Sequence, residues 1–220
     1  MTLMLPNSVF LHIPKTGGIW VRNAIARAQI ETFEYGEQHS HFPELLRYRD
    51  KIFYDKKYVF TFVRHPLSWY QSRWSFRMKH GWRMAHPLDY NCASNDFHEF
   101  VRNCMKYKPS GWVSWEYASF IENFPGAVNF VGKQESLAND LVHALNEAGE
   151  KFNEDIIRST ERANDSDVNN MPSKEFAVYS KKLIDEVLEV EIDVVNKYYS
   201  RFSPSDLYDL YCHGRSVSSI

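Results

Sequence analysis

The sequence has few cysteines and no long apolar run, and each absence excludes a class of protein. Only three of the 220 residues are cysteines, Cys92, Cys104 and Cys212, and none belongs to a C-x-x-C pair. Such a set offers no zinc site and indicates reduced thiols, as in a cytoplasmic protein. No run of 18 apolar residues occurs, so we expect no membrane-spanning helix. The first residues, MTLMLPNSV, lack the basic start and the length of a signal peptide.

The chain also lacks a strong charge of either sign. Its formal net charge is −2, which excludes a nucleic-acid-binding protein that works through bulk positive charge. An anion site must therefore be local. The hydrophobic fraction of 44% is that of an ordinary globular protein, and the length fits one domain over residues 1–220. Aromatic residues concentrate between positions 69 and 124, where residues 80–124 are a candidate substrate-side insertion.

Short apolar segments alternate with amphipathic ones along the chain. Strands are predicted at residues 8–12, 58–63 and 127–131. Helices are predicted after each strand, from residue 19, over residues 66–79 and over residues 135–148, and two more over residues 95–107 and 180–199. Residues 80–94 look irregular and are a candidate flap. This alternation predicts an α/β fold with a parallel sheet and right-handed crossovers.

The segment LHIPKTGGIW places a cation, a hydroxyl and two glycines between the first strand and the first helix. A glycine-rich turn at a helix N-terminus lets backbone N–H groups converge on a phosphate-like anion. Lys15 adds a positive charge and Thr16 a hydroxyl, while Gly17 and Gly18 leave the backbone accessible. The alternative is a tight turn with a solvated lysine. The order is not that of a Walker A loop, in which the lysine follows the glycines.

A second polar cluster follows the second predicted strand, YVFTFV. Arg64 comes at the carboxyl end of that strand, where its guanidinium can form two hydrogen bonds to a phosphate. Ser72 lies two helical turns into the next predicted helix, with Ser68 as a weaker alternative. The carboxyl ends of neighbouring parallel strands are where open α/β sheets bind ligands. The alternative is an ion-paired arginine and an ordinary helical serine.

These two segments resemble the signatures of sulfotransferases that use 3′-phosphoadenosine 5′-phosphosulfate (PAPS). PKTGG resembles their 5′-phosphosulfate loop, and Arg64-His65-Pro66 with Ser72 fits their R-x-P-x-x-x-x-x-S motif. The phrase FLHIPKTGG is most similar to the carbohydrate branch, which includes the heparan sulfate 2-O-sulfotransferases. The resemblance implies a P-loop-like, three-layer α/β/α fold around a central parallel sheet, with no metal.

The resemblance also implies roles for individual residues. Lys15 would act in catalysis and, together with the loop through Ile19 and Trp20, bind the 5′ end of PAPS. Arg64 and Ser72 would bind the 3′-phosphate. Ile19 departs from many relatives, which have Thr or Ser there. The segment FVGKQESL resembles the third strand-to-helix junction, and Arg162 with Asn164 is a candidate for closing a late loop over the nucleotide.

The catalytic base is expected among the histidines of the segment QHSHF. Histidine can take a proton from an acceptor hydroxyl near neutral pH. The 2-O-sulfotransferases have a similar His-x-His at this point, so His41 is the first choice and His39 the second. A structural histidine pair is the alternative. Rival bases are Glu34, Glu37 and Glu44, and His12 is expected to pack locally.

The function that the resemblance implies is transfer of a sulfuryl group from PAPS to a hydroxyl, on a carbohydrate by analogy with that branch. Lipid, metabolite and peptide tyrosine acceptors stay open. Without an anchor the chain resembles a bacterial-type cytoplasmic member, with no nucleic-acid or membrane partner. The alternatives are a P-loop-type kinase and a PAPS-binding module that has lost its base.

Overall fold

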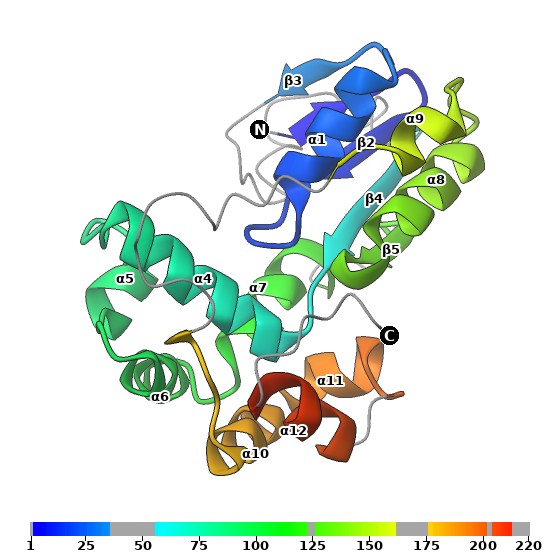
Figure 1. Ribbon diagram of the computed structural model, residues 1–220. Helices are drawn as coiled ribbons and strands as arrows, with labels where there is room; N and C mark the ends of the chain where they lie inside the picture. The colour runs from blue at the N-terminus through cyan, green and yellow to red at the C-terminus, as the bar shows by residue number, and fades with distance from the viewer. Residues whose placement is uncertain (1, 36–55, 123–125, 162–175, 202–203, 213–220) are drawn as a thin grey trace. The chain divides into compact units, whose positions relative to one another are not determined.

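The computed structural model describes residues 2–35, 56–122, 126–161, 176–201 and 204–212 (Figure 1). The chain divides into two compact units. The first unit comprises Met1–Arg64 and Tyr117–Ala163, and the second comprises His65–Glu116 and Asn164–Ile220. The chain therefore leaves the first unit after Arg64 and re-enters it at Tyr117.

The first unit is built on a five-stranded mixed sheet of order β3-β1-β2-β4-β5. The strands are β1 Thr2–Met4, β2 Ser8–Leu11, β3 Phe33–Tyr35, β4 Tyr58–Val63 and β5 Phe130–Lys133. β2, β4 and β5 pair in parallel, as the alternation of strands and helices predicts. β1 pairs antiparallel with both β2 and β3, so the sheet is mixed and not purely parallel. The antiparallel edge was not predicted, because these short strands lack a pattern of their own.

Helices pack on this sheet through a shared apolar core. They are α1 Gly18–Arg27, α8 Leu137–Glu147 and α9 Glu154–Arg158, with the π-helix Ala118–Glu122 and the 3₁₀ turn Gln134–Ser136. Figure 1 shows α1, α8 and α9 beside the strands. Phe10, Phe60 and Phe62 are fully buried, and their rings form stacked and edge-on pairs at 5.5–6.1 Å. Burial of these rings fixes how the helix faces meet the sheet.

β5 begins and ends later than residues 127–131, the range that the sequence predicts. The Asn129 side chain accepts a hydrogen bond from the Val59 amide at 2.8 Å, while the Asn129 amide donates to the Val59 carbonyl. The side-chain oxygen thus replaces a strand partner, and the ladder starts at Phe130. Gly132 does not end the strand but lies within it. A Cβ there would lie 2.7 Å from the Phe62 ring, which explains a glycine inside a strand.

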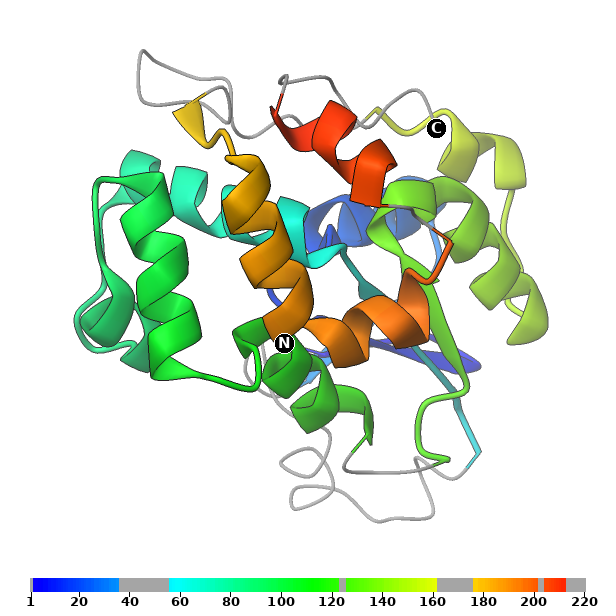
Figure 2. The same cartoon turned by 90° about the horizontal axis from the view of Figure 1, so that it is seen from below.

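The second unit is helical in its described residues. Its helices are α4 Pro66–His80, α5 Pro87–Cys92, α6 Phe97–Tyr107, α7 Trp112–Tyr117, α10 Lys181–Val190, α11 Ile192–Tyr198 and α12 Pro204–Cys212. The last residue of α7, Tyr117, is where the chain re-enters the first unit. Figure 2 shows α10, α11 and α12 from a second direction. The predicted irregular stretch 80–94 contains α5. That helix begins with Pro87 at its first position. His86 caps it, because the His86 ring accepts a hydrogen bond from the Leu88 amide.

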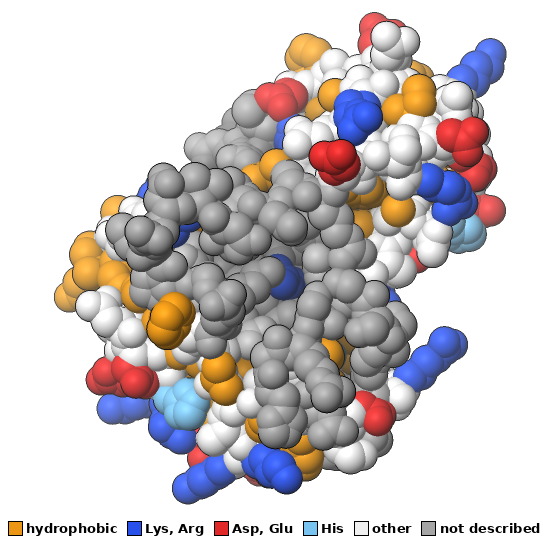
Figure 3. All heavy atoms as spheres, in the orientation of Figure 1, with side chains coloured by type: hydrophobic (Ala, Val, Ile, Leu, Met, Phe, Trp, Pro, Cys, Tyr) orange, Lys and Arg blue, Asp and Glu red, His pale blue; other side chains and the backbone are white. Residues whose placement is uncertain are grey.

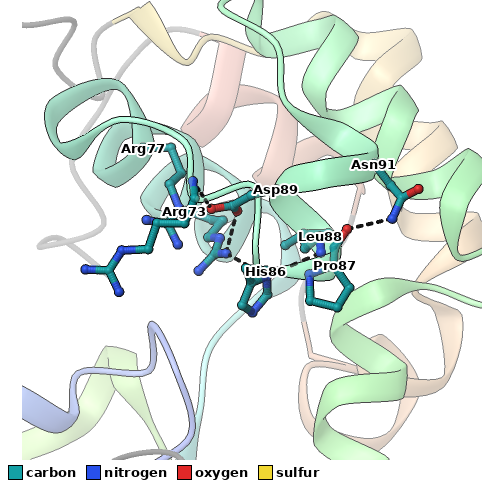
Figure 4. A network of polar contacts seen from close by, with 8 residues as sticks. Arg73, Arg77, His86, Pro87, Leu88, Asp89 and Asn91 are labelled. Carbon is teal, nitrogen blue, oxygen red and sulfur yellow. Dashed lines mark hydrogen bonds and ion pairs between the residues drawn. The ribbon is translucent and has the colours of Figure 1, made fainter.

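A buried ion-pair cluster joins α4 to α5. Arg73 and Arg77 each contact one carboxylate oxygen of Asp89 at 2.6 Å, and the Asp89 side chain is fully buried (Figure 4). The Arg83 amide also donates to Asp89 at 3.0 Å. A buried carboxylate is tolerated when charges and hydrogen bonds compensate its lost hydration. Asp89 therefore fixes the position of α5 on α4.

The helix predicted over residues 180–199 is two helices, α10 and α11, separated at Glu191. Acidic residues of a helix usually lie on its solvated face, but Glu191 does not. Its carboxylate is fully buried and accepts from the Tyr70 hydroxyl at 2.6 Å and from the Ser114 amide at 2.7 Å. Burial raises its pKa, while these hydrogen bonds oppose the rise. The break between the two helices thus coincides with a buried, hydrogen-bonded carboxylate.

In the part of the chain that the structure describes, no helix is long and apolar enough to cross a membrane. On the face drawn in Figure 3, acidic and basic side chains are interspersed over the described residues. This mixture agrees with the small net charge of −2.

Candidate phosphate-binding site

The candidate site lies in the first unit, at the carboxyl ends of β2 and β4. These neighbouring parallel strands are in register, with Phe10 opposite Phe60 and Leu11 opposite Thr61. The chain leaves β2 into the loop of residues 12–17, which leads to α1, and leaves β4 at Arg64. The loop of residues 12–17 and Arg64 thus lie at the same edge of the sheet, because parallel strands end on the same side.

The loop of residues 12–17 has an unusual backbone. Lys15 has a φ of 65° and Gly17 a φ of 93°, both in the left-handed region. For glycine this costs little, but for lysine it is uncommon. Left-handed residues next to right-handed ones are a way of turning successive backbone amides toward an anion. The loop is therefore held in a conformation that local preference alone does not favour.

The start of α1 presents donors without an acidic residue beside them. The first backbone hydrogen bond of the helix runs from the Val21 amide to the Gly17 carbonyl at 3.2 Å. The amides of residues 18–20 therefore precede the helical ladder. Within α1, whose residues are all described, the first turn contains no acidic side chain. The positive end of the helix dipole thus lies in a turn that contains no acidic side chain.

Side chains of the protein itself explain the two glycines. A Cβ on Gly18 would lie 2.1 Å from the His12 ring, and a Cβ on Gly17 would lie 2.6 Å from Leu137. The His12 ring is buried and stacks on Phe10 at 5.8 Å, in line with the expectation that it packs locally. Close packing against the His12 ring therefore requires glycine at position 18, while at position 17 the φ of 93° favours glycine.

Thr16 is fully buried, and its hydroxyl donates to the Ile13 carbonyl at 2.9 Å. This hydrogen bond stabilises the turn. A contact from the Thr16 hydroxyl to a phosphate stays a prediction, and in the described arrangement its proton points to Ile13. The Thr16 side chain, which the sequence analysis expects to bind a ligand, thus stabilises the loop itself.

Arg64 connects the two motifs directly. Its guanidinium Nη1 donates to the Lys15 carbonyl at 3.2 Å, across 49 residues of sequence. Its backbone amide donates to the Tyr117 hydroxyl at 2.9 Å, and that hydroxyl donates to the Arg64 carbonyl at 2.9 Å. The Arg64 side chain is therefore tied to the backbone of the loop of residues 12–17.

Ile19 and Trp20, the last residues of the predicted nucleotide loop, point to different surroundings. Ile19 is 52% exposed. Trp20 is buried in the apolar core, and its indole Nε1 donates to the Thr160 carbonyl at 3.2 Å. Trp20 thus anchors the first turn of α1 to the end of α9, and through its side chain it belongs to the scaffold.

The second motif continues into the second unit, on α4. Ser72 is half-buried there, and its contact with a 3′-phosphate stays a prediction. The Ser68 hydroxyl donates to the His65 carbonyl at 3.0 Å, so Ser68 stabilises the start of α4. His65 caps the same helix, since its Nδ1 accepts from the Leu67 amide. Burial lowers the pKa of His65 to about 3, so this imidazole is neutral at pH 7.

Several predicted site residues lie outside the described residues. They are the histidines His39 and His41, the alternative bases Glu37 and Glu44, and the late-loop candidates Arg162 and Asn164. The remaining alternative base, Glu34 on β3, forms an exposed ion pair with Arg22 at 2.6 Å.

The third predicted junction, between β5 and α8, is stabilised by Asp140. Its carboxylate accepts from the Lys133 amide at 2.6 Å and from the Ser136 hydroxyl at 2.7 Å. These hydrogen bonds hold the turn that follows β5. Asp140 thus has a structural role at this junction.

Sequence reasoning missed Tyr117, because nothing in the local pattern SWEYASF separates this tyrosine from its neighbours. Only pairing across 53 residues reveals its contact with Arg64.

Among the described residues no group of three His, Cys, Asp or Glu side chains could hold a metal ion. Comparison of the chain with family models, curated proteins and solved structures finds no match.

Proposed function

We propose that this protein is a PAPS-dependent sulfotransferase that transfers a sulfuryl group to a hydroxyl of a saccharide. The proposal includes a three-layer, P-loop-like fold. It is supported by three parallel strands, β2, β4 and β5, each followed in the chain by a helix: α1, α4 and α8, the last after the 3₁₀ turn. One observation carries the functional part, namely the hydrogen bond from Arg64 to the Lys15 carbonyl. It joins the two segments that resemble nucleotide-binding signatures.

The residues of this edge fit an anionic nucleotide. Lys15 and Arg64 supply two positive charges, and the first turn of α1 supplies backbone donors with no acidic residue within the turn. Preorganised donors of this kind bind phosphate and sulfate groups well. Lys15, Gly17 and Gly18 would hold the 5′ end, and Arg64 with Ser72 the 3′-phosphate.

In the proposed reaction PAPS supplies the sulfuryl group. His41 takes the proton of the acceptor hydroxyl as its oxygen bonds to sulfur, and the bond from sulfur to the 5′-phosphate oxygen breaks. Lys15 donates a hydrogen bond to that leaving oxygen and offsets its growing negative charge. Positioning and preorganised electrostatics thus carry the catalysis.

Calorimetry with PAPS and with its product, 3′-phosphoadenosine 5′-phosphate (PAP), tests the nucleotide assignment. We expect both to bind the wild-type protein and neither to bind a variant that combines Lys15→Ala with Arg64→Ala. A folded wild-type protein that ignores both nucleotides would contradict the proposal. Binding of ATP with magnesium in place of PAPS would favour a kinase.

Sulfur-labelled PAPS offered with a panel of saccharides tests the reaction itself. Label should pass to an acceptor with the wild-type protein and not with His41→Ala, although that variant should bind PAP as tightly. Binding without transfer to any acceptor would indicate a PAPS-binding module. Transfer to a lipid, a metabolite or a tyrosine peptide would correct the acceptor class alone.

A further inference from the structure

We propose that Tyr117 is the positioning residue for Arg64, and that its hydroxyl sets the direction from which Arg64 reaches the nucleotide. The Tyr117 side chain is fully buried. Its single hydroxyl accepts from the Arg64 amide and donates to the Arg64 carbonyl, each at 2.9 Å. One side chain therefore satisfies both backbone polar groups of one residue.

Arg64 lies just beyond the strand ladder, so the contacts with Tyr117 determine the orientation of its backbone. The parallel ladder between β2 and β4 ends at the pair of Leu11 and Thr61, and that between β4 and β5 ends at Val63 and Lys133. Arg64 is the first residue after the ladder and the last before the cap of α4. The Tyr117 hydroxyl takes the place that a strand partner would have, and it fixes the plane of the Arg64 backbone.

Fixing that backbone fixes where the guanidinium can go. Arg64 is 9% exposed, and its Nη1 reaches the Lys15 carbonyl at 3.2 Å. A rotation of the backbone by a few tens of degrees would move the far end of this long side chain by several ångströms. In this role Tyr117 acts through Arg64, so we call it a positioning residue and not a catalytic one.

The inference rests on the proposed function, in which Arg64 binds the 3′-phosphate. The readout is therefore the preference for PAP over adenosine 5′-phosphate, which lacks that phosphate, measured as the ratio of the two dissociation constants. Tyr117→Phe removes the hydroxyl and keeps the ring. We expect this ratio to fall roughly tenfold, the factor that corresponds to one net hydrogen bond.

Tyr179→Phe is the matched control. Tyr179 is also a buried tyrosine, and its hydroxyl donates to the Leu67 carbonyl at 2.9 Å. This variant loses a comparable hydrogen bond in the second unit. We expect it to lose stability, yet to keep the wild-type preference for PAP. An equal fall of the preference in both variants would reduce Tyr117 to a general structural role.

Arg64→Ala separates the two hypotheses. If that variant keeps the preference for PAP, Arg64 does not bind the 3′-phosphate and this part of the proposed function fails. If Arg64→Ala loses the preference and folded Tyr117→Phe keeps it, the positioning role is wrong while the function stands. Should Tyr117→Phe not fold, 4-aminophenylalanine at position 117 replaces it. Its amine keeps a donor but is a poor acceptor, so the preference should fall in part, and an unchanged preference would overturn the inference.

Discussion

Lys15 combines a strained backbone with a positive charge that the proposed function uses. Its φ of 65° favours glycine, and a lysine there is uncommon. Such strain persists only when the surrounding structure holds it, and here the Arg64 guanidinium bonds the Lys15 carbonyl. The position thus keeps a lysine at some cost in stability, as expected if its charge acts in the proposed function.

We expect Lys15→Ala to lower the turnover of PAPS by roughly 10²-fold or more, the scale for losing a donor to a developing oxyanion. Labelled transfer at saturating PAPS measures this effect. Lys15→Gly should lose as much activity but unfold at a higher temperature than Lys15→Ala, because glycine accepts a positive φ. Lys151→Ala, at an exposed lysine of the same unit, is the control. An unchanged turnover in Lys15→Ala would remove lysine from the mechanism.

Glu116 is a buried acid next to Tyr117 in the chain. Burial raises its pKa to about 8, Arg73 opposes the rise and Glu191 adds to it. Because the folded protein holds this proton more tightly than the unfolded chain, the folded state binds more protons between pH 4.5 and about 8. The contribution of Glu116 to stability therefore declines as the pH rises through this range.

Glu116→Gln stays neutral at every pH, so it should gain stability relative to the wild type between pH 5 and pH 8. The gain is on the order of a few kcal/mol by pH 8. Urea unfolding at several pH values measures it, and Glu189→Gln, at an exposed carboxyl of α10, is the control. A difference that does not grow with pH would show that the Glu116 carboxyl is ionised throughout.

At the scale of elements, two kinds of contact decide how the helices of the second unit pack. Apolar faces bring α4, α5 and α6 together, as the buried Trp69, Leu88 and Phe100 show. Polar contacts then fix how these helices are oriented on one another. The Asp89 carboxylate between Arg73 and Arg77 holds α5 on α4, and the Glu191 carboxylate holds the break after α10 against α7.

We expect Asp89→Asn to destabilise the protein by about 3–5 kcal/mol, because it leaves two buried guanidinium groups without their shared counter-ion. The measurement is the free energy of unfolding in urea. The control is Glu186→Gln, which removes the partly exposed ion pair with Arg102 and should cost about 1 kcal/mol or less. Similar losses in both variants would mean that Asp89 is well hydrated.

The aromatic helices α6 and α7 carry a cluster that suits the predicted substrate-side role of residues 80–124. Tyr107 stacks on Trp112 at 6.0 Å, and Trp112 lies 4.9 Å from Trp115. Tyr107 and Trp115 are 40% and 41% exposed. Aromatic faces of this kind can contact a sugar ring, although the role of this segment stays a prediction.

The whole molecule has no general attraction for anions. With a net charge of −2 and interspersed surface charges, binding of a nucleotide depends on a local site. Saturation with PAP at about 100 times its dissociation constant should therefore raise the free energy of unfolding by about 2.7 kcal/mol. The shift should vanish when Lys15→Ala and Arg64→Ala are combined.

Hydrogen exchange locates the same effect. PAP should slow exchange at the amides of residues 18–20, which precede the hydrogen-bond ladder of α1. The amides of α6 serve as an internal reference in the second unit. Protection that appears equally in α6 and in residues 18–20 would indicate general stabilisation and not a site at the loop.

The sequence alone determined the parts of this protein that depend on neighbouring residues. The apolar runs of β2 and β4, the glycine turn into α1, and Pro66 at the start of α4 are local signals, and the structure has each element where the pattern predicts it. Lys15 and Arg64 could be singled out because each follows a recognisable strand. Their roles stay predictions.

Only the tertiary structure decided what depends on residues far apart. Asn129 moves the start of β5 through its hydrogen bonds with Val59, Glu191 divides a predicted helix, and Tyr117 binds both backbone groups of Arg64. A hydrogen bond between residues tens of positions apart leaves no trace in the local pattern of either partner. Such contacts exist only when folding brings the two segments together, and they set the geometry in which the local signals act.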